Sequence, residues 1–163
     1  MVNGKQKGSA FEREVCKALS LWTTNGKSVD VYWRAAMSGG RATVAKGAVR
    51  QAGDITAVAP EGHVLTDFLY IECKHLKDIS LDGIIKGNGN LLEIWRKTLF
   101  EAAKYNKVPV LIFKQNHWPI AFCTMQAGID YLKIPELLVL IKSSKHAFNL
   151  IRFDELLKIP FSL

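Results

Sequence analysis

Phe68-Leu-Tyr-Ile-Glu-Cys-Lys74 is the stretch that decides how this chain folds and what chemistry it supports. Its aromatic and β-branched residues predict a strand, which we expect to run from His63 to Cys73. Side chains alternate along a strand, so Glu72 and Lys74 project from one face, about 7 Å apart, and Cys73 points to the other. Charged groups are rarely buried unless they are paired or bind a metal, so the pair marks a candidate site.

A second acidic residue precedes this strand. Residues 54–59 predict a short apolar strand, and the Pro-Glu-Gly at 60–62 predicts a turn. We therefore expect a hairpin that brings the carboxylate of Asp54 toward Glu72.

Two carboxylates and a lysine form a chemically sensible set. Mg²⁺ prefers oxygen ligands, and Asp54, Glu72 and the backbone carbonyl of Cys73 are the candidate ligands. Lys74 would hold or polarise the attacking water, or stabilise negative charge that develops on a phosphate. The alternative is a plain salt bridge at the end of a strand, with Asp54 as a turn residue.

The rest of the pattern predicts helices and strands around these elements. We expect helices over 9–23, where Ser9 and Glu12 fit a capping box, and over 91–105. We expect strands over 29–36, 108–114, 118–125 and 147–152, a closing helix over 153–158 and a loop over 75–90, while 137–141 fits either helix or strand. This order predicts one α/β domain over residues 1–163, with a central mixed β-sheet flanked by helices.

The charge of the chain favours a polyanionic partner. Its 163 residues include 22 Lys and Arg against 15 Asp and Glu, a net charge of +7. Between Asp30 and Asp54 there is no acidic residue, and the glycines there predict a basic loop that would contact phosphate. The alternative is a solvated loop that happens to be positive. We assign DNA contacts to Arg34, Ser38, Arg41, Lys46 and Arg50 in and around this loop, and to Lys7 near the N-terminus.

Other classes of protein are disfavoured. No apolar run reaches the roughly 20 residues of a transmembrane helix, and the N-terminal residues lack the apolar segment of a secretory signal. The cysteines, Cys16, Cys73 and Cys123, form no C-x-x-C pair, which argues against a disulfide framework or a zinc site. We expect no membrane association and a reducing, cytoplasmic compartment.

The candidate site also resembles a known family. Gly53-Asp54 followed by Glu72-x-Lys74 resembles the PD-(D/E)xK nuclease signature, with Gly in place of the usual Pro. Residues 7–15, Lys-Gly-Ser-Ala-Phe-Glu-Arg-Glu-Val, resemble the K-G-x-x-x-E-R-E opening of archaeal-type Holliday junction resolvases. In that family a strand and loop ahead of the Asp motif carry an Arg and a Ser. Residues 33–38, which contain Arg34 and Ser38, resemble this stretch. The resemblance leaves the tail after Met125 unexplained, and phage nucleases of this type look closer to the whole chain.

This resemblance implies a restriction-endonuclease-like core and a metal-dependent DNA endonuclease. The implied catalytic residues are Glu12, Asp54, Glu72 and Lys74. The implied cofactor is Mg²⁺, with Mn²⁺ as a substitute. The implied substrate is branched DNA such as a four-way junction, cut by a homodimer in the cytoplasm of a bacterial host.

Three alternatives stay open at this stage. The chain could be another PD-(D/E)xK nuclease that acts on duplex or end-containing DNA, or a non-catalytic DNA-binding module on the same fold. Helix geometry also does not separate Glu12 from Glu14, because each flanks the apolar face.

Overall fold

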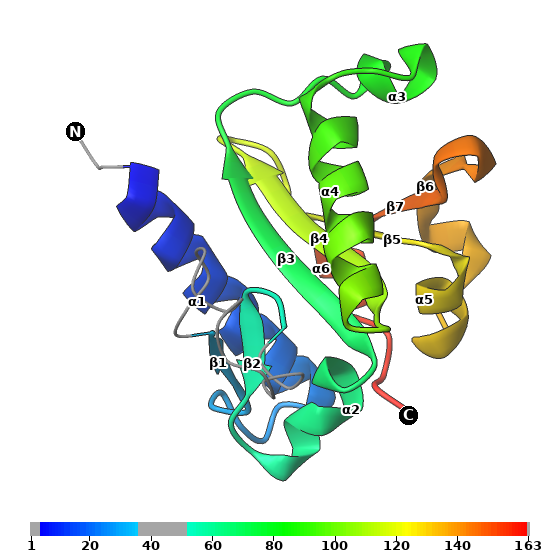
Figure 1. The fold of residues 1–163 in the computed structure, drawn as a ribbon. Coiled ribbons are helices and arrows are strands. Elements are labelled where there is room, and N and C mark those ends of the chain that lie inside the picture. Colours follow the sequence, from blue (N-terminus) through cyan, green and yellow to red (C-terminus); the bar gives the residue numbers. More distant parts are fainter. Residues whose placement is uncertain (1–3, 36–51, 163) are drawn as a thin grey trace.

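The computed structural model describes residues 4–35 and 52–162. Its centre is a five-stranded sheet in the order β3-β4-β5-β7-β6 (Figure 1). The strands are β3 (Leu69–Leu76), β4 (Val108–Gln115), β5 (Ala121–Thr124), β6 (Val139–Ser143) and β7 (Phe148–Arg152). β3 and β4 run parallel, and the other neighbouring pairs run antiparallel. The expected mixed sheet is confirmed.

Helices cover both faces of this sheet (Figure 1). They are α1 (Gly4–Thr23), α2 (His63–Thr66), α3 (Asp82–Lys86), α4 (Asn90–Lys104), α5 (Gln126–Tyr131) and α6 (Phe153–Leu156). In β4, Val110 and Ile112 pack in the same core as α1, whereas Leu111 and Phe113 pack with the buried residues of α4. Successive strand residues face opposite sides, so α1 and α4 lie on opposite faces. No helix in the described residues is both long and apolar enough to span a membrane.

The predicted hairpin is wrong. β2 (Ile55–Ala57) pairs antiparallel with β1 (Tyr32–Arg34), and these two form a separate small sheet. A 3-10 turn (Pro60–Gly62) and α2 follow β2, so the first half of the strand expected over 63–73 is helical. A short apolar run does not distinguish a buried strand from a buried helix, which explains the error.

One neighbour of β3 in the fold follows it in the sequence, and the other precedes it. It pairs with β4, which follows it through the crossover helices α3 and α4. On its other edge a parallel bridge joins Gly53 to Ile71. Asp54 therefore lies against the edge of β3 through the bridge at Gly53, just before β2 begins.

Several element boundaries also differ from those expected. α1 begins at Gly4 and not at residue 9, so Ser9 lies inside the helix and the capping box is wrong. Low helix propensity at Gly8 and Ser9 is a weak determinant that the surrounding structure overrides. The expected loop over 75–90 contains the end of β3 and all of α3, and α5 was not predicted. The ambiguous segment 137–141 is split between a 3-10 turn (Glu136–Leu138) and β6, and a second turn (Ser144–His146) precedes β7.

The remaining predictions hold, with bounds that differ by at most three residues at either end. The helix expected over 91–105 is α4, and the strands over 108–114, 118–125 and 147–152 are β4, β5 and β7. The strands expected over 29–36 and 54–59 are β1 and β2.

Candidate active site

Asp54 is held against the free edge of β3 by its backbone. Its N–H donates to the carbonyl oxygen of Ile71 over 2.8 Å, and its carbonyl oxygen accepts from the N–H of Ala35 over 2.9 Å. Its carboxylate then reaches one step further along β3, where Oδ2 accepts the N–H of Cys73 over 2.9 Å. Three hydrogen bonds to two segments therefore fix Asp54, a residue that is only 7% exposed.

Gly53 makes this close approach feasible. Its φ is +92°, in the left-handed region that side chains disfavour. A Cβ at this position would lie 2.6 Å from the carbonyl oxygen of Ile71. Proline is restricted to φ near −65°, so it could not adopt this backbone. The glycine that replaces the signature proline is thus required by how this chain brings Asp54 to β3.

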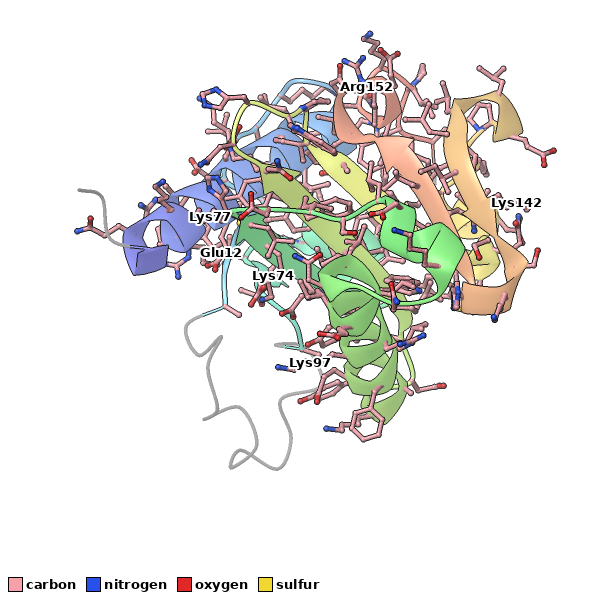
Figure 2. The ribbon with its side chains drawn as sticks, turned by 90° about the horizontal axis from the view of Figure 1, so that it is seen from above. Glu12, Lys74, Lys77, Lys97, Lys142 and Arg152 are labelled. Atoms are coloured by element: carbon pink, nitrogen blue, oxygen red, sulfur yellow. The ribbon has the colours of Figure 1, made fainter. Side chains whose placement is uncertain are left out.

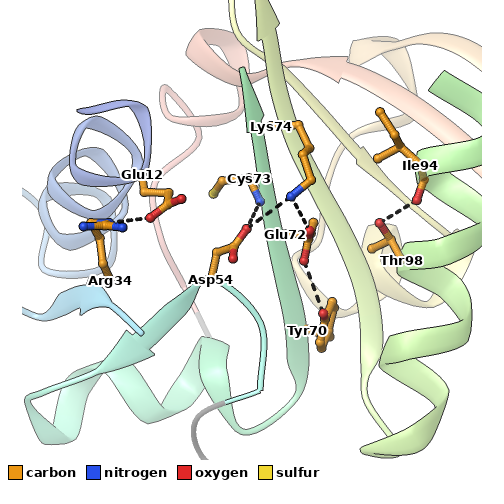
Figure 3. A network of polar contacts seen from close by, with 9 residues as sticks. All are labelled: Glu12, Arg34, Asp54, Tyr70, Glu72, Cys73, Lys74, Ile94 and Thr98. Atoms are coloured by element: carbon orange, nitrogen blue, oxygen red, sulfur yellow. Dashed lines mark hydrogen bonds and ion pairs between the residues drawn. The ribbon is translucent and has the colours of Figure 1, made fainter. Parts of the chain in front are cut away.

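Glu72 and Lys74 lie on one face of β3, as predicted from strand alternation (Figure 3). Nζ of Lys74 lies 2.5 Å from Oε1 of Glu72 and 3.9 Å from Oδ2 of Asp54. The hydroxyl of Tyr70, two residues earlier on the same face, donates to Oε2 of Glu72 over 3.2 Å. The structure therefore brings the three predicted residues together and adds Tyr70. Sequence reasoning missed Tyr70, although the same alternation places it beside Glu72.

The charges in this cluster shift one another's ionisation. Burial, together with the neighbouring charge of Glu72, raises the pKa of Asp54 to about 6. Burial lowers the pKa of Lys74, but its contact with Glu72 and the charge of Asp54 outweigh that effect, so the net pKa is raised. Two carboxylates crowded at one end of a strand are stabilised by a cation, and here the ammonium of Lys74 lies between them.

These groups fit a hard divalent cation. In the part of the chain that the structure describes, no three His, Cys, Asp or Glu side chains gather as a metal site, so two carboxylates are what this site offers. Mg²⁺ is usually held by one or two carboxylates, with water and substrate phosphate completing its shell. The N–H of Cys73 points to the Asp54 side of β3, and in a strand the carbonyl of the same residue points the same way. The predicted third ligand thus faces the correct edge.

Comparison with known protein families agrees with this geometry. Residues 3–153 match the family described as phage putative PDDEXK endonuclease. The chain belongs to this family. No curated protein and no solved structure matches it. The match covers Asp54, Glu72 and Lys74 and continues past Met125 through the tail that the resemblance had left unexplained. The endonuclease family also establishes the restriction-endonuclease-like fold and the general activity of a nuclease, and nucleases of this superfamily use divalent metal ions.

The endonuclease presents Glu12 from α1 to the Asp54 side of the site (Figure 3). Its carboxylate accepts a charge-assisted hydrogen bond from Nε of Arg34, and its negative charge contributes to the raised pKa of Asp54. Glu14 points elsewhere and pairs with Nζ of Lys114 at 2.6 Å. The geometry therefore favours Glu12 over Glu14 as the acidic residue of α1 near the site.

The predicted DNA contacts are only partly within the described residues. Lys7 is exposed on α1, and Arg34 reaches Glu12 from β1. Ser38, Arg41, Lys46 and Arg50 lie outside the described residues. Figure 2 shows two further lysines of the endonuclease on the same side as Glu12 and Lys74, namely Lys77 after β3 and Lys97 on α4. These two carry no sequence signal apart from their charge.

Proposed function

We propose that this endonuclease hydrolyses phosphodiester bonds of DNA in a Mg²⁺-dependent reaction, and that it cuts four-way junctions as a homodimer. One observation supports the catalytic part of the proposal, which is the meeting of Asp54, Glu72 and Lys74 within 4 Å of the lysine's Nζ. Membership of the endonuclease family supports a DNA substrate.

Each residue has a role that follows from its surroundings. Asp54, Glu72 and the carbonyl of Cys73 would hold the metal, which when bound neutralises phosphate charge and makes water a better nucleophile. The N–H of Cys73 orients Asp54, and the hydroxyl of Tyr70 orients Glu72. The ammonium of Lys74 would hydrogen-bond the attacking water or a phosphate oxygen, and would stabilise the negative charge that develops there.

The junction substrate rests on α1. Glu12 lies in the K-G-x-x-x-E-R-E-like segment, and its carboxylate reaches Arg34 and the Asp54 side of the site rather than the end of its own helix. That position supports the role that the resolvase resemblance implies for it. The homodimer, the host-cell cytoplasm and a role in DNA recombination follow from the same resemblance.

A cleavage assay in Mg²⁺ tests the proposal. Labelled four-way junction, linear duplex, flap and single-stranded DNA are compared with wild-type protein, Glu72→Gln and Lys74→Ala. The matched control makes the same changes at an exposed pair on the far side of the sheet, Glu155→Gln and Lys158→Ala, whose Oε1 and Nζ are 2.8 Å apart. Each site variant should lose at least about 100-fold in rate, as expected when an electrostatic contact to the transition state is removed.

The outcomes separate the parts of the proposal. Symmetric nicking of the junction alone, lost in the site variants and kept in the controls, supports a resolvase. Cutting of every substrate refutes junction selectivity and keeps the nuclease, and a monomer by sedimentation on junction DNA refutes the homodimer. Tight DNA binding without cleavage by any variant would make the chain a DNA-binding module and refute the proposed catalysis.

A further inference from the structure

A pocket of about 490 Å³ lies between α1 and β1, beside the candidate active site. We call it the α1–β1 pocket. The residues that matter for its chemistry are Arg13, Cys16, Lys17, Asp30, Trp33 and Arg34. Its volume is in the range of about 300–1,000 Å³ that small-molecule sites occupy, so one nucleotide would fit.

An exposed tryptophan lines the pocket. Trp33 is 60% exposed, although its neighbour Tyr32 on the same strand is 1% exposed and belongs to the core. Cys16 also lines the pocket and is 5% exposed, so it contributes a small apolar surface there. An exposed indole face is the kind of surface on which an unstacked nucleobase packs.

Two cations stand over the same pocket. Arg13 and Lys17 are exposed and lie four residues apart on α1, so they are neighbours on its surface. Neither forms an ion pair with a described residue, unlike the neighbouring Glu12 and Glu14, which pair with Arg34 and Lys114. Like charges at this spacing destabilise a helix slightly. Asp30 is the acidic residue among those that line the pocket, so positive charges outnumber negative ones there. This excess of positive charge favours a phosphate.

β1 connects this pocket directly to the catalytic residues. Arg34 lines the pocket and donates to Glu12, and the next residue, Ala35, donates its N–H to the carbonyl of Asp54. Two residues of strand span about 7 Å from Trp33 to Ala35. A base against Trp33 would therefore be linked to Asp54 through consecutive residues of β1 and the adjoining Ala35.

We infer that the α1–β1 pocket binds one unpaired nucleotide of the DNA substrate, with its base against the indole of Trp33 and its phosphate held by Arg13 and Lys17. This inference rests on the proposed function and names what the substrate must offer, namely a base that is free of its partner close to the scissile phosphate. A branch point supplies such a base, because pairing is strained or broken there, whereas continuous duplex does not.

Binding in EDTA, where no cleavage occurs, tests the pocket. The probes are a fluorescein-labelled duplex with one unpaired thymine, the same duplex with an abasic residue in its place, and the fully paired duplex. Wild type should bind the unpaired thymine about 5- to 100-fold more tightly than the abasic probe, because stacking on an aromatic side chain has that effect. Trp33→Ala should abolish the difference, and Trp33→Phe should restore part of it.

The matched control is Trp118→Ala, which removes a second exposed tryptophan (44% exposed) located between β4 and β5. It should leave the preference for the unpaired thymine intact. A Trp33→Ala variant that keeps the wild-type preference refutes the inference, as does a wild type without any preference. If thermal melting shows that Trp33→Ala is poorly folded, the preference for the unpaired thymine is compared between Trp33→Phe, wild type and Trp118→Ala, and that comparison tests the inference.

Salt dependence tests the two cations separately. Replacing Arg13 and Lys17 together with Gln should reduce the slope of log K against log salt by about 0.7 to 0.9, since the two side chains hold one phosphate and each neutralised phosphate contributes that amount. Lys145→Gln, an exposed lysine in the turn before β7, should not change it. An unchanged slope in the double variant refutes the phosphate contact.

Cleavage of the same probes in Mg²⁺ separates this inference from the proposed function. Binding that depends on Trp33, with no cleavage of any probe or junction, refutes the nuclease and keeps the pocket. Junction cleavage that Trp33→Ala performs at the wild-type rate and affinity refutes the pocket and keeps the nuclease.

Discussion

Asp54 should destabilise the metal-free protein at neutral pH. Its pKa is raised from 3.8 to about 6, because its charged form is buried and lies near Glu72. A carboxyl group with a raised folded-state pKa binds its proton more tightly in the folded state. The stability it contributes is fully present below about pH 4 and is lost as the pH rises through about 6.

The substitution Asp54→Asn tests this loss of stability, because it removes the charge of Asp54. A shift of about two units corresponds to about 3 kcal/mol, at 1.36 kcal/mol per unit. The amide keeps an oxygen that can accept the N–H of Cys73, so that hydrogen bond is retained. In EDTA at pH 8 the variant should therefore be more stable by up to about 3 kcal/mol, which raises Tm by about 6 to 12 °C in a domain of this size.

Thermal unfolding by circular dichroism, measured in EDTA from pH 4 to pH 8, is the assay. The difference in Tm between Asp54→Asn and wild type should grow between pH 4 and pH 6 and then level off. At pH 4 the two proteins should unfold at nearly the same temperature. Asp78→Asn makes the same chemical change at an exposed position and should shift Tm little at any pH. A variant that is no more stable than wild type at pH 8, or a gain that persists unchanged at pH 4, would refute the reasoning.

Three further predictions concern the same site. Mg²⁺ should raise the Tm of wild type through preferential binding to the folded state and should leave Asp54→Asn nearly unchanged; equal shifts in both would show that the metal binds elsewhere. Tyr70→Phe removes the hydroxyl that orients Glu72 and should lower the cleavage rate about 10- to 100-fold while Tm changes little, and a wild-type rate would exclude the positioning role. Gly53→Ala should lower the free energy of unfolding, measured in urea, by about 1–3 kcal/mol or more, because a strained backbone and a clash with β3 act together. Gly26→Ala is its control, since Gly26 has a similar φ of +84° with nothing within 4 Å; equal losses would mean that the clash contributes nothing.

Part of this protein could be predicted because the information is local. Strand alternation alone places Glu72 and Lys74 on one face of β3, and the structure puts their charged atoms 2.5 Å apart. Apolar spacing of 3.6 residues identifies α4, and buried apolar runs identify β4 and β7. The departure from the nuclease signature, Gly for Pro, was visible in the sequence, but its reason was not.

Local patterns in the sequence therefore identify the candidate site residues of β3 and the class of fold, because residue type and period are properties of a short segment. The partner of each strand was decided by tertiary structure. The sequence favoured a hairpin between Asp54 and Glu72, whereas the folded chain inserts α2 and joins the two through one bridge at Gly53, whose positive φ permits contact with Ile71. Glu12 likewise lies near Asp54 because α1 packs against Leu69, Ile71 and Cys73 of β3 and Arg34 binds its carboxylate. Such pairings depend on which buried surfaces fit together over the whole domain, and no local pattern encodes that choice.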